Sequence, residues 1–238
     1  MILKHFQILG KKANQEDAYF YSQDHSLFVV CDGVGGRNGG EVASRTIVEN
    51  IRKQYVSIAD KKIDLTLIND MIRSAIEDLN EISTEQDTLD GMSTTLALLY
   101  VSNGRAYTAH IGDSRIRKLN QSNKEIWSTK DHSIVQELFD AGVLNSESDM
   151  QKHPYRNRIT KAIVANNTKL SDVVFDEIPT IDNNDIFIVC SDGLLEHYTN
   201  NSLLDAFAKR DFEDVFFDMK MTCEKNSRDN STVIIYKP

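Results

Sequence analysis

Five aspartates, each at a predicted strand end or tight turn, are the residues of this sequence best suited to chemistry. Two short apolar runs, residues 28–31 and 186–190, lead into two of them. Such runs are typical of strands buried on both faces. A glycine follows each of these two aspartates and lets the backbone turn or approach a ligand. The five are Asp17, Asp32, Asp113, Asp192 and Asp229.

Carboxylates in this pattern indicate a site for hard divalent cations. Mg²⁺ and Mn²⁺ prefer carboxylates, backbone carbonyls and water as ligands. Two such ions about 3.5–4 Å apart can activate water at neutral pH and hold a phosphoryl group for in-line attack. The alternative is that Asp-Gly pairs only make turns. The spacing alone does not show that the five carboxylates converge, and both interpretations stay open at this point.

A glycine-rich stretch follows Asp32 and suggests a nucleotide loop, but the spacing excludes one. A dinucleotide fingerprint that starts at Gly33 needs a glycine at position 38, which is Asn38. A phosphate loop that ends at Gly40 needs a lysine next, and Glu41 stands there. The spacing of residues 33–40 therefore does not predict a nucleotide-binding loop.

Bulk properties narrow the function classes. The chain has 238 residues, 40% of them hydrophobic, which suits one large domain or two small ones. The net charge of −9 without a basic block disfavours nucleic acid, and no apolar run is long enough to cross a membrane. We therefore expect a cytoplasmic protein with neither partner. Three cysteines without ligand spacing, Cys31, Cys190 and Cys223, are expected to be free and buried.

The order of predicted elements fits antiparallel sheets with helices on their outer faces rather than a regular strand–helix alternation. Asn103-Gly104 predicts a tight hairpin, and a second hairpin turn is expected at 121–124. Residues 142–160 are polar and irregular, which suggests a flap. Strands are predicted at 1–9, 18–21, 27–31, 93–101, 105–111, 115–119, 125–128, 172–178, 185–190 and 231–236, and helices at 41–55, 65–83, 131–141, 201–209 and 212–225.

Eight short motifs occur in one order along the chain, and together they are specific. The sequence resembles the metal-dependent protein phosphatases, the type 2C serine/threonine phosphatases, in their compact bacterial form. This resemblance implies an α+β fold, a four-layer αββα sandwich of two antiparallel sheets flanked by helices, as one domain over 1–238 with a flap at 142–160. The motifs lie at 14–17, 32–44, 91–95, 112–115, 129–133, 157–162, 191–194 and 228–232.

The resemblance also implies a role for each acidic position. It gives Asp32, Asp192 and Asp229 as the catalytic carboxylates and implies two Mn²⁺ or Mg²⁺ ions, with a third in a weaker site. Asp32 would bridge two ions, the Gly33 carbonyl would bind one, and Asp192 and Asp229 would complete the first. Glu16 and Asp17 would act through metal-bound water, and Asp113 with Asp192 would form the third site. A plain turn residue is the alternative for Asp113.

Two positions depart from the family pattern. Lys12 stands where relatives carry an arginine that binds substrate phosphate. A lysine can meet phosphate as a point charge but cannot fork across two oxygens, and a solvated surface lysine is the alternative. Val34 stands where some members place a histidine proposed as general acid.

The resulting prediction is an enzyme that hydrolyses phosphoserine and phosphothreonine by direct attack of a metal-bridging hydroxide. One alternative is an inactive module that binds phosphoproteins without cleaving them. Another is a two-metal hydrolase of nucleotides or phosphodiesters, which the acidic net charge disfavours. The family implies phosphorylated protein substrates and a partner serine/threonine kinase, and we expect a monomer.

Overall fold

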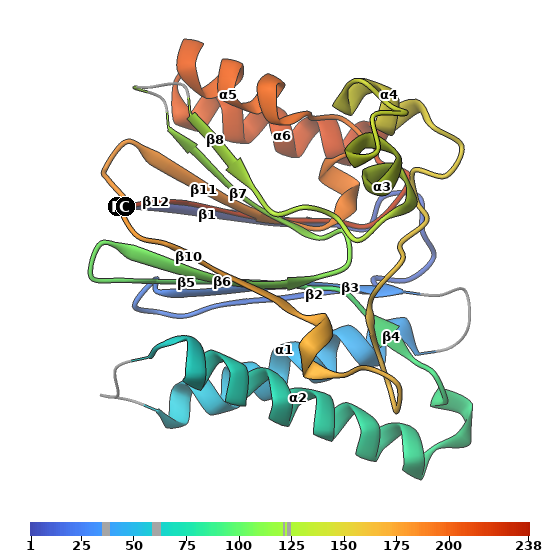
Figure 1. Ribbon diagram of the computed structural model, residues 1–238. Coiled ribbons are helices and arrows are strands. Elements are labelled where there is room, and N and C mark those ends of the chain that lie inside the picture. The colour runs from blue at the N-terminus through green and yellow to red at the C-terminus, as the bar shows by residue number, and fades with distance from the viewer. Residues whose placement is uncertain (35–38, 59–62, 121, 123–124) are drawn as a thin grey trace.

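Two antiparallel sheets stacked face to face form the centre of the protein, and helices cover both outer faces (Figure 1). The computed structural model describes residues 1–34, 39–58, 63–120, 122 and 125–238. The predicted α+β fold, a four-layer αββα sandwich, is confirmed. The predicted turn at 121–124 and the glycine-rich stretch at 35–38 fall largely or wholly outside the described residues.

The first sheet carries the helices of the C-terminal part of the chain. Leu119, Ile186 and Ile188 face these helices and pack with Phe207 and Met219. The predicted N-terminal strand lies at the sheet edge and pairs with the C-terminal strand. The strand order is β1 (Ile2–Ile8), β12 (Ser231–Lys237), β11 (Asp185–Cys190), β7 (Arg115–Asn120) and β8 (Glu125–Ser128), and the helices are α5 (Asn200–Lys209) and α6 (Phe212–Asn226).

The second sheet carries the two long early helices, α1 (Gly40–Ser57) and α2 (Leu65–Glu85). Their apolar residues recur at three- and four-residue spacing, and those that are buried, such as Ile47 and Ile72, pack on the sheet. The strand order is β10 (Val174–Ile178), β6 (Arg105–Ile111), β5 (Leu96–Ser102), β3 (Leu27–Val34), β4 (Ser93–Thr94) and β9 (Ile163–Val164), and β2 (Asp17–Tyr21) also pairs with β3.

Strand β3 explains why one aspartate reaches the space between the sheets. Successive side chains of a strand point to opposite faces. Leu27 and Val29 pack toward α1 and α2, whereas Phe28 and Val30 pack against the other sheet. Asp32 continues the second series. Both faces of β3 are buried, which accounts for its unbroken apolar run.

Three predictions about elements were wrong in detail. Strand β3 does not end before Asp32 but continues to Val34, because it pairs with the short strand β4. The predicted strand 93–101 is divided into β4 and β5 at Thr95, which bonds to Asp32 instead of continuing the ladder. The two-residue strand β9 was not predicted, because two residues carry no periodic signal.

The segment 142–160 is not wholly irregular. It contains the helix α4 (Glu147–Lys152), in which the Ser146 hydroxyl accepts a hydrogen bond from the Asp149 amide. One and a half turns are too short for a recognisable apolar stripe. The preceding helix, α3 (Ile134–Asp140), is capped by Ser133, whose hydroxyl accepts a hydrogen bond from the Gln136 amide. Three short 3₁₀ helices complete the structure at Asp87–Leu89, Leu170–Asp172 and Asp192–Leu194.

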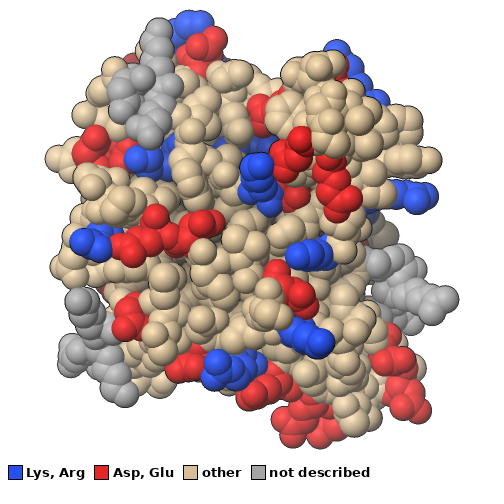
Figure 2. Space-filling model, in the orientation of Figure 1, with Lys and Arg blue, Asp and Glu red and all other residues tan. Residues whose placement is uncertain are grey.

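The composition bears on three features of the structure: surface charge, the apolarity of the helices and the burial of the cysteines. Basic and acidic side chains are interspersed over much of the face shown in Figure 2. Among the described residues, no helix is both long and apolar enough to cross a membrane. All three cysteines are buried and free. Phe217 of α6 is 60% exposed, although it is a large apolar residue within a helix.

Candidate metal centre

The acidic residues identified in the sequence come together where the two sheets end on one side of the sandwich. Asp17 and Asp32 are paired across β2 and β3. Asp192 follows β11 of the other sheet and lies close enough to hydrogen bond with the Asp32 side chain. Asp229 and Asp113 lie near enough for their charges to act on Asp32. The tertiary structure therefore brings together five carboxylates that are far apart in sequence.

The backbone of Asp32 is held on both sides by two threonines of the β4–β5 junction. The Asp32 amide donates to the Thr95 hydroxyl at 2.9 Å. The Asp32 carbonyl accepts from the Thr95 amide and from the Thr94 hydroxyl, both at 2.8 Å. These contacts are the reason that β5 is interrupted, and they fix the direction of the Asp32 side chain. The threonines belong to a motif in the sequence, but nothing there showed that they act on Asp32.

Gly33 has no room for a side chain. A Cβ built on it would lie 2.4 Å from the carbonyl of Gly40 and 2.8 Å from the carbonyl oxygen of Glu16. The Gly33 amide donates to that same Glu16 oxygen at 3.0 Å. The glycine therefore lets the Glu16 segment and the start of α1 approach the end of β3.

Asn230 joins the Glu16 segment to the Asp229 segment. Its side-chain oxygen accepts from the Glu16 amide at 2.8 Å, and its side-chain nitrogen donates to the carbonyls of Leu9 and Asn14 at 2.8 and 3.1 Å. Sequence reasoning gave Asn230 no role, although it stood beside Asp229 in one of the motifs. Its function is to position two acidic residues that are more than 200 positions apart.

The negative charges of the carboxylates in the centre are not balanced by nearby positive charges among the described residues. Loss of hydration, together with the charge of Asp17 and the other neighbouring carboxylates, raises the pKa of Asp32 well above its usual value. Desolvation, together with the charges of neighbouring carboxylates, also raises the pKa values of Asp192, Asp113 and Asp17, and desolvation is the largest cause in each case. The pKa of Asp192 lies well above the usual value, that of Asp113 is about 7 and that of Asp17 is about 6. Buried carboxylates without counter-ions are costly, and a bound cation would relieve that cost.

Unpartnered oxygens show where a cation could bind. Among the described residues, the Oδ1 atoms of Asp17 and Asp192 are buried and accept no hydrogen bond. The other Asp17 oxygen accepts from the Ser191 hydroxyl at 2.8 Å. Over the same described ranges, no three acidic, histidine or cysteine side chains already surround a single point as a ready ligand set. The donor chemistry fits Mg²⁺ or Mn²⁺, and small side-chain movements would have to complete the site.

Lys12 lies at the edge of this centre. Its ammonium is 2.8 Å from Asp229 Oδ1 and 4.0 Å from Glu16 Oε2. Burial by itself lowers the Lys12 pKa, but the hydrogen bond and charge of Asp229 and the charge of Glu16 raise it overall. The structure thus places Lys12 on an acidic residue of the centre and not as a freely solvated surface lysine.

The Asp113 turn is fixed by the segment that leads into α3. The Gly112 amide donates to His132 Nδ1 at 3.1 Å, and the His132 amide donates to the Gly112 carbonyl at 2.8 Å. Burial, together with the charges of His110 and Lys161, lowers the His132 pKa to about 4. His132 is therefore neutral at pH 7, and its two hydrogen bonds to Gly112 give it a structural role. His110 is buried against it with the rings stacked.

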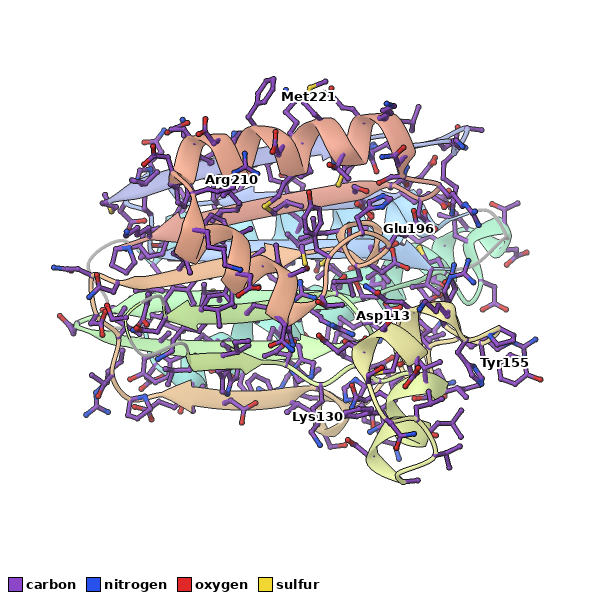
Figure 3. The ribbon with its side chains drawn as sticks, turned by 90° about the horizontal axis from the view of Figure 1, so that it is seen from above. Asp113, Lys130, Tyr155, Glu196, Arg210 and Met221 are labelled. Carbon is purple, nitrogen blue, oxygen red and sulfur yellow. The ribbon has the colours of Figure 1, made fainter. Side chains whose placement is uncertain are left out.

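A second charged cluster lies beside the centre and is fully paired. Arg115 donates to both Asp131 oxygens, at 2.5 and 2.7 Å, and lies 3.4 Å from Glu147 of α4. The other Glu147 oxygen accepts from the Asn200 amide at the start of α5, at 2.9 Å. This cluster attaches α4 to β7 and α5. In Figure 3, Asp113 lies between the helices α3 and α4 and the segment that carries Glu196.

Comparison with known proteins agrees with this geometry. The model of the family described as protein phosphatase 2C matches residues 8–233. The serine/threonine phosphatase stp of Listeria welshimeri serovar 6b is 30% identical over 230 residues, which cover 91% of this chain and 86% of that protein. The solved serine/threonine phosphatase Stp1 from Staphylococcus aureus has a TM-score of 0.81 at 28% identity, with 99% of this chain and 94% of that chain covered.

A more distant structure shares the fold. The catalytic domain of the serine/threonine protein phosphatase PstP, solved in complex with two manganese ions, has a TM-score of 0.79 at 23% identity and covers 98% of this chain and 96% of that chain. The family match spans nearly the whole sequence and agrees with the eight motifs in order. This chain therefore belongs to the protein phosphatase 2C family.

Proposed function

We propose that this protein hydrolyses phosphoserine and phosphothreonine on other proteins with the help of two Mn²⁺ or Mg²⁺ ions. The family is one of metal-dependent phosphatases. The observation that carries the proposal is the cluster of five carboxylates, two of which have buried oxygens without a partner. The manganese ions in the PstP structure support the choice of ion.

Each acidic residue has a distinct part in this proposal. Asp32 would bridge the two ions, with the Gly33 carbonyl on one of them. Asp192 and Asp229 would complete the first ion. Glu16 and Asp17 would hold water molecules around the pair, and Asp113 with Asp192 would hold a third, weaker ion. When bound, such ions activate water at neutral pH and bind phosphoryl oxygens.

The remaining residues would orient the substrate and position the carboxylates. Lys12 would attract the phosphate as a point charge, since its ammonium already lies on the Asp229 side of the centre. Thr94 and Thr95 would keep Asp32 in place through the bonds described above. His132 cannot supply a proton as an imidazolium at pH 7, because its pKa is about 4. Val34 offers no proton either, so we assign no side chain as general acid.

The proposal is tested by hydrolysis of a phosphothreonine peptide. We expect activity with Mn²⁺, none with EDTA, and a loss of at least about a hundredfold in Asp32→Asn, because losing even an indirect support of a metal ligand costs 10–100-fold. Asp214→Asn, an exposed acid on α6, is the matched control and should keep full activity. Equal rates under all of these conditions would contradict the proposal.

Two alternatives are less well supported. An inactive phosphoprotein-binding module has no chemical need for the carboxylate cluster, and the related proteins named above are phosphatases. A hydrolase of nucleotides or phosphodiesters acts on anionic substrates, and a protein of net charge −9 disfavours their approach. A nucleotide panel assayed beside phosphopeptides separates this second alternative from the main proposal.

The proposed substrates are phosphorylated proteins, and the natural counterpart is a serine/threonine kinase that phosphorylates them. We further infer that the protein acts in the cytoplasm as a monomer. Light scattering after size-exclusion chromatography should give the mass of one chain, and a dimer mass would contradict that part of the proposal.

A further inference from the structure

A cavity of about 380 Å³ adjoins the metal centre. Asp113 and Asp192 form its inner side, so a substrate bound at the centre would reach it directly. One wall comes from α3, α4 and the turn after α4, and another from residues 195–199 (Figure 3). Its volume suits one or two side chains rather than a whole peptide. The roles proposed above leave this cavity without a function.

The acids of the cavity wall already have partners inside the protein. Asp131 and Glu147 are bound to Arg115. Glu196 accepts a hydrogen bond from the backbone amide of Arg228 at 2.8 Å. His197 adds no charge at neutral pH, because burial lowers the pKa of its ring. These three acids are thus held by contacts inside the protein, whereas the other two acids of the cavity, Asp113 and Asp192, belong to the metal centre, where bound cations would neutralise them.

Two arginines of the cavity are in the opposite situation. Arg156 lies in the turn after α4, and Arg228 lies next to Asp229. Within the part of the chain that the structure describes, neither guanidinium has an ion pair or a side-chain hydrogen bond. Arg158, two residues after Arg156, differs because its guanidinium lies 5.0 Å from the centre of the Tyr155 ring and does not line the cavity. Free guanidinium groups recognise carboxylates and phosphates through two parallel hydrogen bonds.

We propose that this cavity is a specificity subsite that binds an anionic side chain near the phosphorylated residue of the substrate, through Arg156 and Arg228. The inference rests on the proposed phosphatase activity and names its substrate class, which is phosphoproteins with an acidic or second phosphorylated residue close to the target. Both guanidinium groups come from segments that border the centre. Because Arg156 and Arg228 line the same cavity as Asp113 and Asp192, a peptide whose phosphate binds at the ions would have a neighbouring residue within this cavity.

The test compares phosphothreonine peptides that differ only in the residues two to four positions from the phosphothreonine. Glutamine, glutamate, phosphoserine and lysine are placed there in turn, and kcat and KM are measured with Mn²⁺. We expect kcat/KM for the glutamate peptide to be about three- to tenfold above that for the glutamine peptide, mainly through a lower KM. The phosphoserine peptide shows whether phosphate is preferred to carboxylate. The preference should shrink with added salt, because both arginines are exposed.

Arg156→Gln and the double variant Arg156→Gln/Arg228→Gln should reduce the preference toward one. Arg158→Gln, from the same turn, is the matched control and should retain it. Mn²⁺ binding of the double variant shows whether the neighbouring Asp229 is undisturbed. Equal rates for the glutamate and glutamine peptides, or a preference that survives the double variant, would overturn the subsite and leave the phosphatase proposal intact. Failure of the wild-type protein to cleave any of the peptides would contradict both.

Discussion

Two charged clusters lie side by side in this protein and differ in one respect. Around Arg115, the guanidinium makes two short hydrogen bonds to Asp131 and a longer contact of 3.4 Å to Glu147. In the metal centre, the only cation paired with the five aspartates among the described residues is the ammonium of Lys12. The first cluster is complete and attaches α4 to the sheet. The second is incomplete, and its excess of negative charge is what a divalent cation would neutralise. Burial of charge therefore indicates a ligand site only where the counter-charge is missing.

The largest effect should follow from removing a carboxylate of the incomplete cluster. Asp192→Asn should lower Mn²⁺ affinity and kcat/KM by at least about a hundredfold. The same change should raise the thermal midpoint of the metal-free protein. The Asp192 pKa is raised in the folded state, so its ionised form opposes folding at pH 7. Calorimetry with and without Mn²⁺ measures the metal affinity and the thermal midpoint. A lower midpoint for the metal-free variant than for the metal-free wild type would contradict the view that the Asp192 charge is uncompensated.

Breaking the complete cluster should mainly cost stability. Arg115→Met leaves Asp131 and Glu147 without their partner, and both are largely buried. We expect a loss of about 3 kcal/mol in the free energy of unfolding, measured by urea denaturation. Arg105→Met removes a pair with Glu177 in which both side chains are exposed, at 54% and 35%, and should cost far less stability than Arg115→Met. Equal losses of stability in the two variants would show that the ion pairs of the buried cluster stabilise the protein no more than an exposed pair does.

Lys12 offers a smaller test, because its ammonium competes with a metal ion for Asp229. Lys12→Met should tighten Mn²⁺ binding by about two- to fivefold, the value of a partly exposed ion pair. Titration calorimetry measures the affinity independently of catalysis. Lys11→Met, the exposed neighbouring lysine, should leave the affinity unchanged. Weaker Mn²⁺ binding in Lys12→Met would mean that the ammonium supports the ion instead of competing with it.

His132, which follows Asp131 and bonds to Gly112 beside Asp113, gives a pH dependence. Its folded-state pKa of about 4 is below the usual 6.5, so the unfolded chain binds the proton more readily. Its contribution to stability is complete above pH 6.5 and is lost as the pH falls toward 4. We expect a loss of about 1–2 kcal/mol after allowance for the hydrated part of the ring.

His132→Asn keeps an acceptor near the Gly112 amide but cannot titrate, so the variant isolates this contribution. Urea denaturation of both proteins at pH 7 and pH 5 measures the difference. The wild-type protein should lose more stability than the variant over this interval, and parallel losses would contradict the assignment.

The sequence predicted most of the fold because its strong signals are local. The apolar run before Asp32, the hairpin at Asn103-Gly104 and the stripes of α1 and α2 are each visible within one segment. The hairpin residues have φ values of +52° and +72°, as expected for a tight two-residue turn. The predictions were wrong where the decisive partner is distant. Thr95 interrupts a strand because of Asp32, and α4 forms on a segment with little apolar character.

The sequence by itself determined the chemistry of this protein, because the acidic residues, the glycines between them and the order of the motifs are all legible without coordinates. Only the tertiary structure decided which charges are compensated. Arg115 could have been free and Lys12 could have been solvated, since pairing depends on segments up to 217 positions apart, as between Lys12 and Asp229. Electrostatic energy depends on distance and burial. Both are properties of the folded chain, so the uncompensated centre, and the two arginines beside it that have no side-chain partner among the described residues, appear only in the structure.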